Sequence, residues 1–245
     1  MALLELSNIS YIVKDKSIIR DVSLSVNQGD YITIVGPSGS GKSTLLKLCS
    51  DLISPTSGTI TYNDRPLTAI DPESYRREVG YCFQRPYLFA KTVHRNILFP
   101  YDIRGLKPDM SRIEYLFDLL HMPLNYMERR NDELSGGEMQ RICLIRSLIF
   151  EPKVLLLDEV TSALDTTNTS IVENVIDELH KKGITIISIT HNEEQSLRTA
   201  NRRITIVDGQ FTIISITHNE EQSLRTANRR ITIVDGQLAK EEVLI

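Results

Sequence analysis

A glycine-rich loop between a predicted strand and a predicted helix constrains this 245-residue chain more than any other feature. The loop reads Gly36-Pro37-Ser38-Gly39-Ser40-Gly41-Lys42-Ser43 and fits the pattern G-x-x-x-x-G-K-[ST]. Glycines let consecutive backbone N–H groups surround phosphate oxygens, and the N-terminus of the following helix favours negative charge. Lys42 supplies a positive charge for the β- and γ-phosphates, and Ser43 a hydroxyl for Mg²⁺. The alternative is a plain glycine-rich turn; the strand–loop–helix context favours a nucleotide site.

A second strand ends in two carboxylates. The apolar run Val154-Leu155-Leu156-Leu157 is followed directly by Asp158 and Glu159. Parallel sheets place ligand sites at the carboxyl ends of their strands, where the phosphate loop also lies. We therefore predict that Asp158 holds Mg²⁺ and that Glu159 is the general base for the attacking water. The alternative is an acidic strand end that faces solvent.

The hydrophobic pattern predicts an α/β fold. Alternating apolar residues at 3–9 and 18–26 indicate antiparallel strands, and the β-branched run at 31–35 indicates a buried strand. Between about 85 and 150 the apolar spacing becomes helical, with Ile113, Leu116, Phe117 and Leu120 on one face, which predicts a helical insertion. Strand and helix signals then alternate, so we expect a largely parallel sheet. The later predicted elements are strands at 154–157, 185–189 and 203–207 and helices at 136–149, 168–182 and 193–200.

The chain contains an internal repeat. Residues 185–210 recur without change at 212–237, in a 27-residue unit that occurs twice. Solenoid folds need about three or more diverged repeats, so two near-identical copies indicate a tandem duplication instead. We expect one folded domain at 1–211, a duplicate of 185–211 at 212–238, and a tail at 239–245.

Composition excludes several classes of protein. The formal net charge of −4 gives no electrostatic footprint for nucleic acid, and no apolar run is long enough to span a membrane. The first residues lack the basic and apolar regions of a signal peptide. Cys49, Cys82 and Cys143 are odd in number and far apart, so we expect free, buried thiols in a cytosolic protein, with no disulfide and no metal.

A third motif carries a family resemblance. Leu134-Ser135-Gly136-Gly137-Glu138, continued by Met139-Gln140-Arg141, resembles the signature of ATP-binding-cassette (ABC) ATPases. With the phosphate loop and Asp158-Glu159, the resemblance covers about residues 2–211. It implies a P-loop NTPase core of the ABC type, with an antiparallel β part and a helical signature subdomain at about 85–150. It also implies ATP and Mg²⁺ as cofactors.

The resemblance implies roles for further residues. Gln84 resembles the Q-loop glutamine, which contacts Mg²⁺ and faces the transport partner. Asp165 lies in Ser162-Ala163-Leu164-Asp165, which resembles the D-loop, and His191 resembles the switch histidine that senses the γ-phosphate. His218, in the second copy, competes for that role; His191 has the family spacing, so we predict that the second copy is surplus, or alternatively that it adds an edge strand and helix to the sheet.

The resemblance also implies an aromatic side chain at the ATP site. Tyr11 precedes Gly36 by 25 residues, where the family stacks adenine, although a core tyrosine on the first strand is an alternative. The predicted ATP-binding residues are Tyr11, Gly36, Pro37, Ser38, Gly39, Ser40, Gly41, Lys42, Ser43, Thr44 and Gln84, and those near Mg²⁺ are Ser43, Gln84 and Asp158.

The signature suggests a dimer. Ser135 and the amides of Gly136 and Gly137, with Glu138 in the same turn, form an anion site at a helix start. The phosphate loop already holds one nucleotide. The resemblance therefore implies that the signature serves ATP bound by the opposite subunit of a head-to-tail homodimer.

The resemblance implies an ATPase that powers a separate permease at the cytoplasmic face of the cell membrane. Residues 87–89 and 92–97 lie where the family receives its permease, although Phe89 is equally interpretable as packing within the helical part. The phrases at 81–84 and 96–100 are similar to bacterial iron-export ATP-binding subunits. The alternatives are a small-solute or lipoprotein-type transporter and a soluble ABC ATPase of DNA repair or translation. The acidic charge and the single cassette disfavour the last class, so we expect no nucleic-acid partner.

Overall fold

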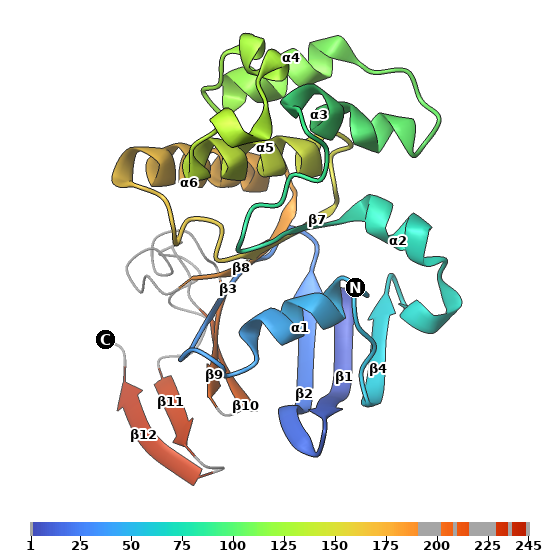
Figure 1. Cartoon of the computed structure of the whole chain (residues 1–245). Helices are drawn as coiled ribbons and strands as arrows, with labels where there is room; N and C mark the ends of the chain where they lie inside the picture. The colour runs from blue at the N-terminus through green and yellow to red at the C-terminus, as the bar shows by residue number, and fades with distance from the viewer. Residues whose placement is uncertain (1, 191–201, 208–209, 216–228, 235–236, 244–245) are drawn as a thin grey trace. The chain divides into compact units, whose positions relative to one another are not determined.

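The computed structural model describes residues 2–190, 202–207, 210–215, 229–234 and 237–243 (Figure 1). The chain divides into two compact units, Met1–Arg76 with Thr185–Ile245, and Arg77–Ile184. No helix in these described ranges is both long and apolar enough to cross a membrane.

The first unit contains an antiparallel sheet in the order β2-β1-β4-β5. Its strands are β1 (Ala2–Val13), β2 (Lys16–Asn27), β4 (Ser57–Tyr62) and β5 (Arg65–Pro66). Lys14 and Asp15 join β1 to β2 with φ of 46° and 66°, as a tight hairpin turn requires. Val22, Leu24 and Val26 alternate into the buried face of β2, which confirms the period-two pattern.

The first unit also contains parallel strands. β3 (Tyr31–Val35) pairs in parallel with β8 (Thr185–Ile189) on one side and with β9 (Arg202–Val207) on the other. β3 and β8 are buried along their whole length, as β-branched runs in a parallel sheet should be. The helix α1 (Lys42–Cys49) follows β3, and the short η1 (Leu67–Ala69) and α2 (Pro72–Glu78) follow β5. Asp71 accepts a hydrogen bond from the Ser74 amide at 2.8 Å and so caps the start of α2.

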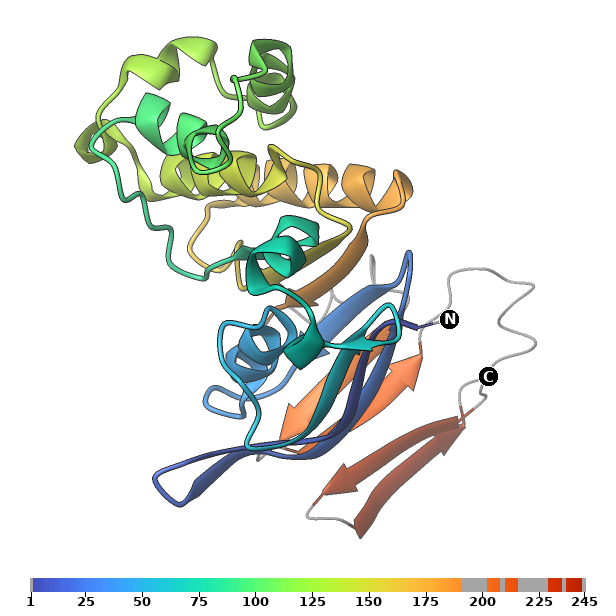
Figure 2. The same ribbon diagram turned by 90° about the vertical axis from the view of Figure 1, so that its right-hand side faces the viewer.

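The repeat boundary falls inside a strand. β10 (Gln210–Ser215) pairs antiparallel with β9, so the start of the second copy forms an added strand beside the first copy (Figure 2). Thr212–Ser215 in β10 has the same sequence as Thr185–Ser188 in the first copy. Thr185–Ser188 lies in β8, which pairs in parallel with β3. β11 (Arg229–Val234) and β12 (Gln237–Val243) form a separate two-stranded sheet. The predicted helix at 193–200 lies outside the described residues.

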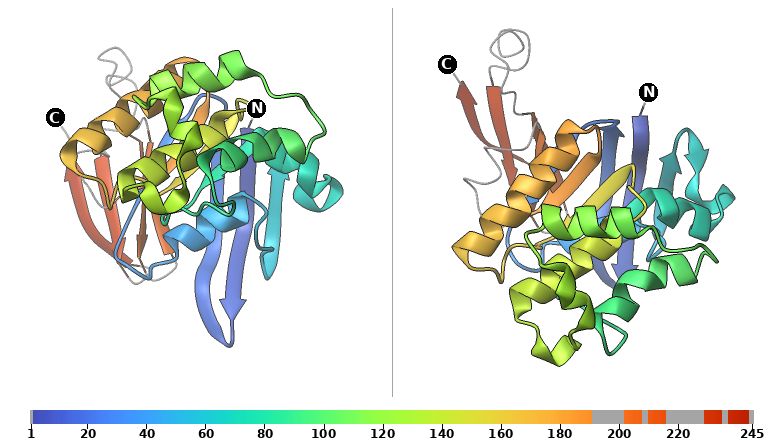
Figure 3. Two further views of the ribbon diagram at one scale, coloured as in Figure 1. Left: turned by 45° about the horizontal axis from the view of Figure 1, so that its top comes forward. Right: turned by 90° about the horizontal axis from the view of Figure 1, so that it is seen from above.

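The second unit combines two parallel strands with helices. β6 (Val79–Cys82) pairs with β7 (Val154–Asp158), and α3 (Val93–Asp102), α4 (Met110–Leu119), α5 (Gly136–Leu148) and α6 (Thr166–Lys181) accompany them (Figure 3). Two 3-10 turns, η2 (Leu124–Glu128) and η3 (Asn131–Glu133), lead into α5. The predicted apolar face of α4 is buried. This unit runs from Arg77 to Ile184 and so includes β6, β7 and α6 as well as the helices between them.

Candidate nucleotide site

The phosphate loop leaves the end of β3 and enters α1 through backbone conformations that favour glycine. Gly36 has φ +146°, and a Cβ there would lie 2.0 Å from the Ile206 backbone oxygen. Gly41 has φ +100°, and its Cβ would lie 2.8 Å from the Ile18 backbone oxygen. The β9 and β2 backbones thus approach the loop too closely for any side chain at these two positions.

Lys42 lies inside the curve of the loop. Its Nζ donates to the backbone oxygens of Gly36 at 2.8 Å and Pro37 at 2.9 Å, and the residue is only 4% exposed. No side chain caps α1, and the buried Ser40 hydroxyl has no hydrogen-bond partner within the described residues. A backbone loop with glycine at its two most crowded positions, a buried cation and a hydroxyl without a partner in the described residues fit a phosphate group at this helix start.

Tyr11 lies opposite Ile19 in the β1–β2 hairpin and is half-buried. The next two residues of β1, Ile12 and Val13, are 48% and 41% exposed. The ring is therefore near an exposed hairpin end, which argues against the interpretation of Tyr11 as a core residue.

The acidic residues belong to the second unit, where two neighbouring strands position them. Asp158 ends β7, is 4% exposed, and accepts a hydrogen bond of 2.8 Å from the Tyr81 hydroxyl on β6. Glu159 follows with φ +50°, a conformation that β-carbon-bearing residues seldom adopt and that directs the chain away from the strand. Tyr81 received no role from the sequence; its position on the strand beside an acidic strand end is the signal that could have identified it.

Gln84 reaches Glu159 across the same pair of strands. The Gln84 Nε2 donates to Glu159 Oε2 at 2.5 Å, and Glu159 is 9% exposed. Gln84 itself is exposed. The structure thus brings two of the predicted site residues into direct contact, although 75 positions separate them.

The signature residues begin α5 through reciprocal capping. Ser135 Oγ accepts a hydrogen bond from the Glu138 amide, and Glu138 Oε2 accepts one of 2.7 Å from the Ser135 amide. Burial opposes ionisation of Glu138, but hydrogen bonds from Tyr126 and Ser135 outweigh it and lower the pKa of this carboxyl. Ser135 and Gly136 are exposed. The start of α5 is therefore rigid and open to solvent.

Asp165 is the N-cap of α6. Its carboxylate accepts hydrogen bonds from the Asn168 amide at 2.8 Å and from Asn168 Nδ2 at 2.7 Å, and these bonds lower the pKa of Asp165. A Cβ on Gly137 would lie 3.2 Å from that same Nδ2. The predicted D-loop residue and the predicted signature are thus connected through Asn168, which sequence reasoning missed; an Asp before a helix is the signal for such a cap.

The predicted histidines and cysteines add nothing to the geometry of the site. His191 and His218 lie outside the described residues. Cys49, Cys82 and Cys143 are free and buried, as predicted, and burial raises the pKa of Cys49 and of Cys82 to about 12. Within the described ranges, no three His, Cys, Asp or Glu side chains are grouped to hold a metal ion. Mg²⁺ beside a nucleotide usually takes only one or two carboxylates, with phosphates and waters completing its shell.

Comparison with known proteins gives one consistent family. The ABC transporter family profile matches residues 19–162. The chain is 42% identical over 205 residues to the probable iron export ATP-binding protein FetA of Escherichia coli (strain K12), covering 83% of this chain and 91% of that protein. It is 36% identical over 203 residues to the lipoprotein-releasing system ATP-binding protein LolD of Leptospira interrogans serogroup Icterohaemorrhagiae serovar Lai, covering 80% and 85%. The fold is similar to that of a dimeric ATP-binding cassette bound to ADP and Pi, with TM-score 0.80 and 24% identity over 88% of this chain and 100% of that one.

Proposed function

This chain belongs to the ABC transporter family of ATP-binding domains, and on that basis we propose that it powers a separate membrane permease that exports a metal ion such as iron. Family membership makes it an ATPase that uses ATP and Mg²⁺. The observation that carries metal export is the 42% identity to FetA, which extends over 91% of that protein.

The phosphate loop binds the triphosphate. The loop amides from Gly36 to Thr44 surround the phosphates, and Lys42 exchanges its two carbonyl contacts for β- and γ-phosphate oxygens. Ser43 supplies a hydroxyl to the metal. Tyr11 stacks on the adenine from its exposed hairpin end.

The acidic residues carry the hydrolytic step. Asp158, held by Tyr81, is the carboxylate ligand of Mg²⁺, which when bound neutralises charge on the β- and γ-phosphates. Glu159 accepts the proton of the attacking water at its carboxylate. Gln84 Nε2 donates to that carboxylate. When the attacking water binds to Glu159, it takes over part of this contact. Gln84 therefore orients the water as well as the metal. His191 senses the γ-phosphate.

The signature serves a second copy of the chain. Ser135, Gly136, Gly137 and Glu138 begin α5 in an exposed, rigidly capped turn that presents backbone amides. This supports a head-to-tail homodimer in which each signature contacts the ATP of the opposite subunit. Asp165, fixed by Asn168 next to Gly137, belongs to the same interface.

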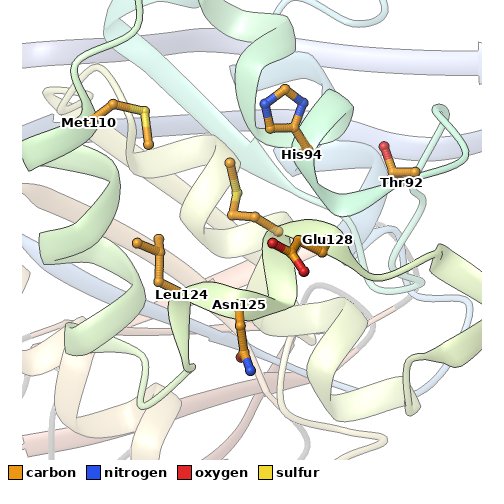
Figure 4. Close-up of a pocket in the computed structure, with 7 residues that line it drawn as sticks. Thr92, His94, Met110, Leu124, Asn125 and Glu128 are labelled. Atoms are coloured by element: carbon orange, nitrogen blue, oxygen red, sulfur yellow. The ribbon is translucent and has the colours of Figure 1, made fainter.

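The permease binds to the second unit. A pocket of about 500 Å³ is lined by Thr92, His94, Met110, Leu124, Asn125, Met127 and Glu128, and Figure 4 shows the labelled side chains arranged around it. Tyr87 and Ile103 in the same unit are 69% and 60% exposed. Phe89 combines both earlier interpretations: its ring lies 4.2 Å from that of Phe99, yet it is 41% exposed. An apolar surface of this kind, at the cytoplasmic face of the membrane, suits a permease segment.

Cells that lack the gene provide the test. Iron-loaded cells should accumulate more intracellular iron than the parent, and the wild-type gene should restore export whereas Glu159→Gln should not. Glu159→Gln keeps the size and the hydrogen bonding of the side chain but removes the base. Unchanged intracellular iron would count against metal export. Retention of lipoproteins in the inner membrane would favour the second candidate, which the similarity to LolD supports.

The histidine assignment has its own test. His191→Ala should abolish ATP hydrolysis, and His218→Ala should leave it intact, because the first copy begins in β8, directly after α6. Full activity of His191→Ala would show that His218 takes the role.

A further inference from the structure

The segment that follows Gln84, residues 85–92, is exposed but is held in place by hydrogen bonds. Phe83, Tyr87 and Phe89 are 49%, 69% and 41% exposed, so burial does not hold this stretch in place. Side chains from elsewhere in the second unit donate to its backbone carbonyls instead. These hydrogen bonds hold the backbone on both sides of Gln84.

One side of α5 runs along the segment. Gln140, Cys143 and Arg146 are three residues apart and so lie on neighbouring turns of one helix side. Gln140 Nε2 donates to the Phe83 carbonyl at 3.4 Å. Arg146 Nη2 donates to the Tyr87 carbonyl at 3.1 Å, and Cys143 Sγ lies 3.6 Å from the same oxygen. The two carbonyls flank Gln84, one immediately before it and one three residues after it.

Arg146 makes further contacts that restrict the segment. Its guanidinium lies 4.9 Å from the centre of the Phe89 ring, and its Nη1 is 3.4 Å from Asn96 Oδ1. Asn96 is fully buried and donates in turn to the Ala90 carbonyl at 3.0 Å. The planar guanidinium thus joins backbone, ring and amide in one network, which a lysine ammonium could not reproduce.

We propose that Arg146, assisted by Gln140, is a positioning residue for hydrolysis: it fixes the segment after Gln84 to α5 and thereby sets Gln84 against Glu159. The inference rests on the proposed role of Gln84. Because Ser135 caps the start of α5, the same attachment links the exposed signature to the Gln84–Glu159 contact. A displacement of α5 would then move Gln84.

The experiment compares Arg146→Met and Arg146→Lys with a matched control, Arg112→Met. Arg112 also donates to a backbone carbonyl, that of Leu148 at 2.8 Å, and pairs with Glu151, but neither contact involves the segment. Each variant is made in the full chain with and without Gln84→Ala. The readouts are kcat and KM for ATP hydrolysis, the ATP dissociation constant by calorimetry, the Tm, and amide hydrogen exchange over residues 85–92.

Arg146→Met should lower kcat about tenfold, as expected for a misplaced reacting group, with the ATP dissociation constant within about twofold of wild type. Exchange over residues 85–92 should accelerate, and Arg146→Lys should lose about threefold in kcat because it keeps the charge but not the fork. Arg112→Met should change neither kcat nor the amide exchange over residues 85–92. In the Gln84→Ala background, Arg146→Met should cause no further loss of kcat, since the effect passes through Gln84.

Equal losses of kcat from Arg146→Met with and without Gln84 would overturn the inference, as would an unchanged kcat. A Gln84→Ala variant with normal kcat would overturn the proposed role of Gln84 and this inference together. If Gln84→Ala is impaired and Arg146→Met is not, only the positioning role fails. Should Arg146→Met not fold, Arg146→Lys in both backgrounds decides by the same criteria.

Discussion

Tyr81 is the side chain that holds Asp158, the proposed Mg²⁺ ligand. Tyr81→Phe removes the hydroxyl that donates to Asp158 at 2.8 Å and leaves the ring packed 4.6 Å from Phe83. Groups that orient a metal ligand typically contribute 10–100-fold to metal affinity, so the Mg²⁺ concentration for half-maximal ATPase activity should rise about tenfold. Tyr115→Phe, which removes a surface hydroxyl near Glu178, is the control and should have no effect. An unchanged Mg²⁺ requirement in Tyr81→Phe would contradict the role of Tyr81.

Glu138 makes the stability of α5 depend on pH. Its pKa in the folded chain lies below the ordinary value of 4.5, so its stabilising effect is present above pH 4.5 and is lost as the pH falls through the folded pKa. Glu138→Gln should lower the free energy of unfolding by about 1 kcal/mol at pH 7, the usual contribution of a helix cap. The difference from wild type should shrink as the pH falls below 4.5 and the wild-type carboxyl becomes protonated. Urea unfolding at pH 7 and at a series of lower pH values measures this, with the exposed Glu114→Gln as control; a difference independent of pH would refute it.

The phosphate loop is shaped by the strands around it. At Gly36 an added Cβ would meet the backbone of β9 at 2.0 Å, whereas at Gly39, with φ +80°, it would meet no atom within 4 Å. Gly39→Ala should therefore cost only the left-handed backbone penalty, about 1 kcal/mol. Gly36→Ala adds overpacking against a backbone that cannot move alone, and should cost about 3 kcal/mol. Thermal and urea unfolding compare the two, and equal losses would show that β9 does not restrict the loop.

The elements that the sequence predicted correctly are those whose evidence is local. The α4 face of Ile113, Leu116 and Phe117 and the fully buried β3 follow from periodicity, and both are confirmed. The helix α3 was not predicted, because Pro100 within it disfavours a helix in isolation. Its start is fixed by Thr92, whose side chain accepts from the Arg95 amide, and its buried Asn96 bonds to carbonyls outside the helix. Tertiary contacts thus outweigh local propensity here.

The duplication allows a prediction about the whole chain, because one copy can be removed. Removing residues 185–211 or residues 211–237 leaves the same polypeptide, in which Gln210 or its copy Gln237 is followed by Leu238. In β11 the sequence Arg229–Val234 pairs with Gln237–Val243, and β9 has the same sequence as β11. The single-copy chain should therefore form that hairpin directly beside β3, and should keep its ATPase activity and a Tm within a few degrees.

Loss of activity or folding in the single-copy chain would show that the second copy contributes to the native structure. Which copy is used in the full-length chain is decided separately, by the two histidine variants. The uncharged segment Thr212–Ser215 in β10 is also the place to examine for association, because unpaired β-rich edges aggregate. Light scattering of the full-length and single-copy chains measures that difference.

By itself, the sequence determined the phosphate loop, the acidic strand end, the signature turn and the alternation of strands and helices. Each of these depends on residues that are neighbours in the chain, through backbone freedom, capping or side-chain period. It also determined the family, since the three motifs occur in order.

Only the tertiary structure showed that Tyr81 holds Asp158 and that Gln84 contacts Glu159. It also showed that a side chain of α5 donates to a backbone carbonyl of the segment after Gln84. The first two contacts join residues 77 and 75 positions apart, and they exist because β6 pairs in register with β7. The repeat gives the same lesson: Thr-Ile-Ile-Ser is a parallel strand beside β3 in one copy and an antiparallel strand beside β9 in the other. A strand's sequence specifies that it will pair, but its partner and direction depend on which edge the rest of the chain leaves open.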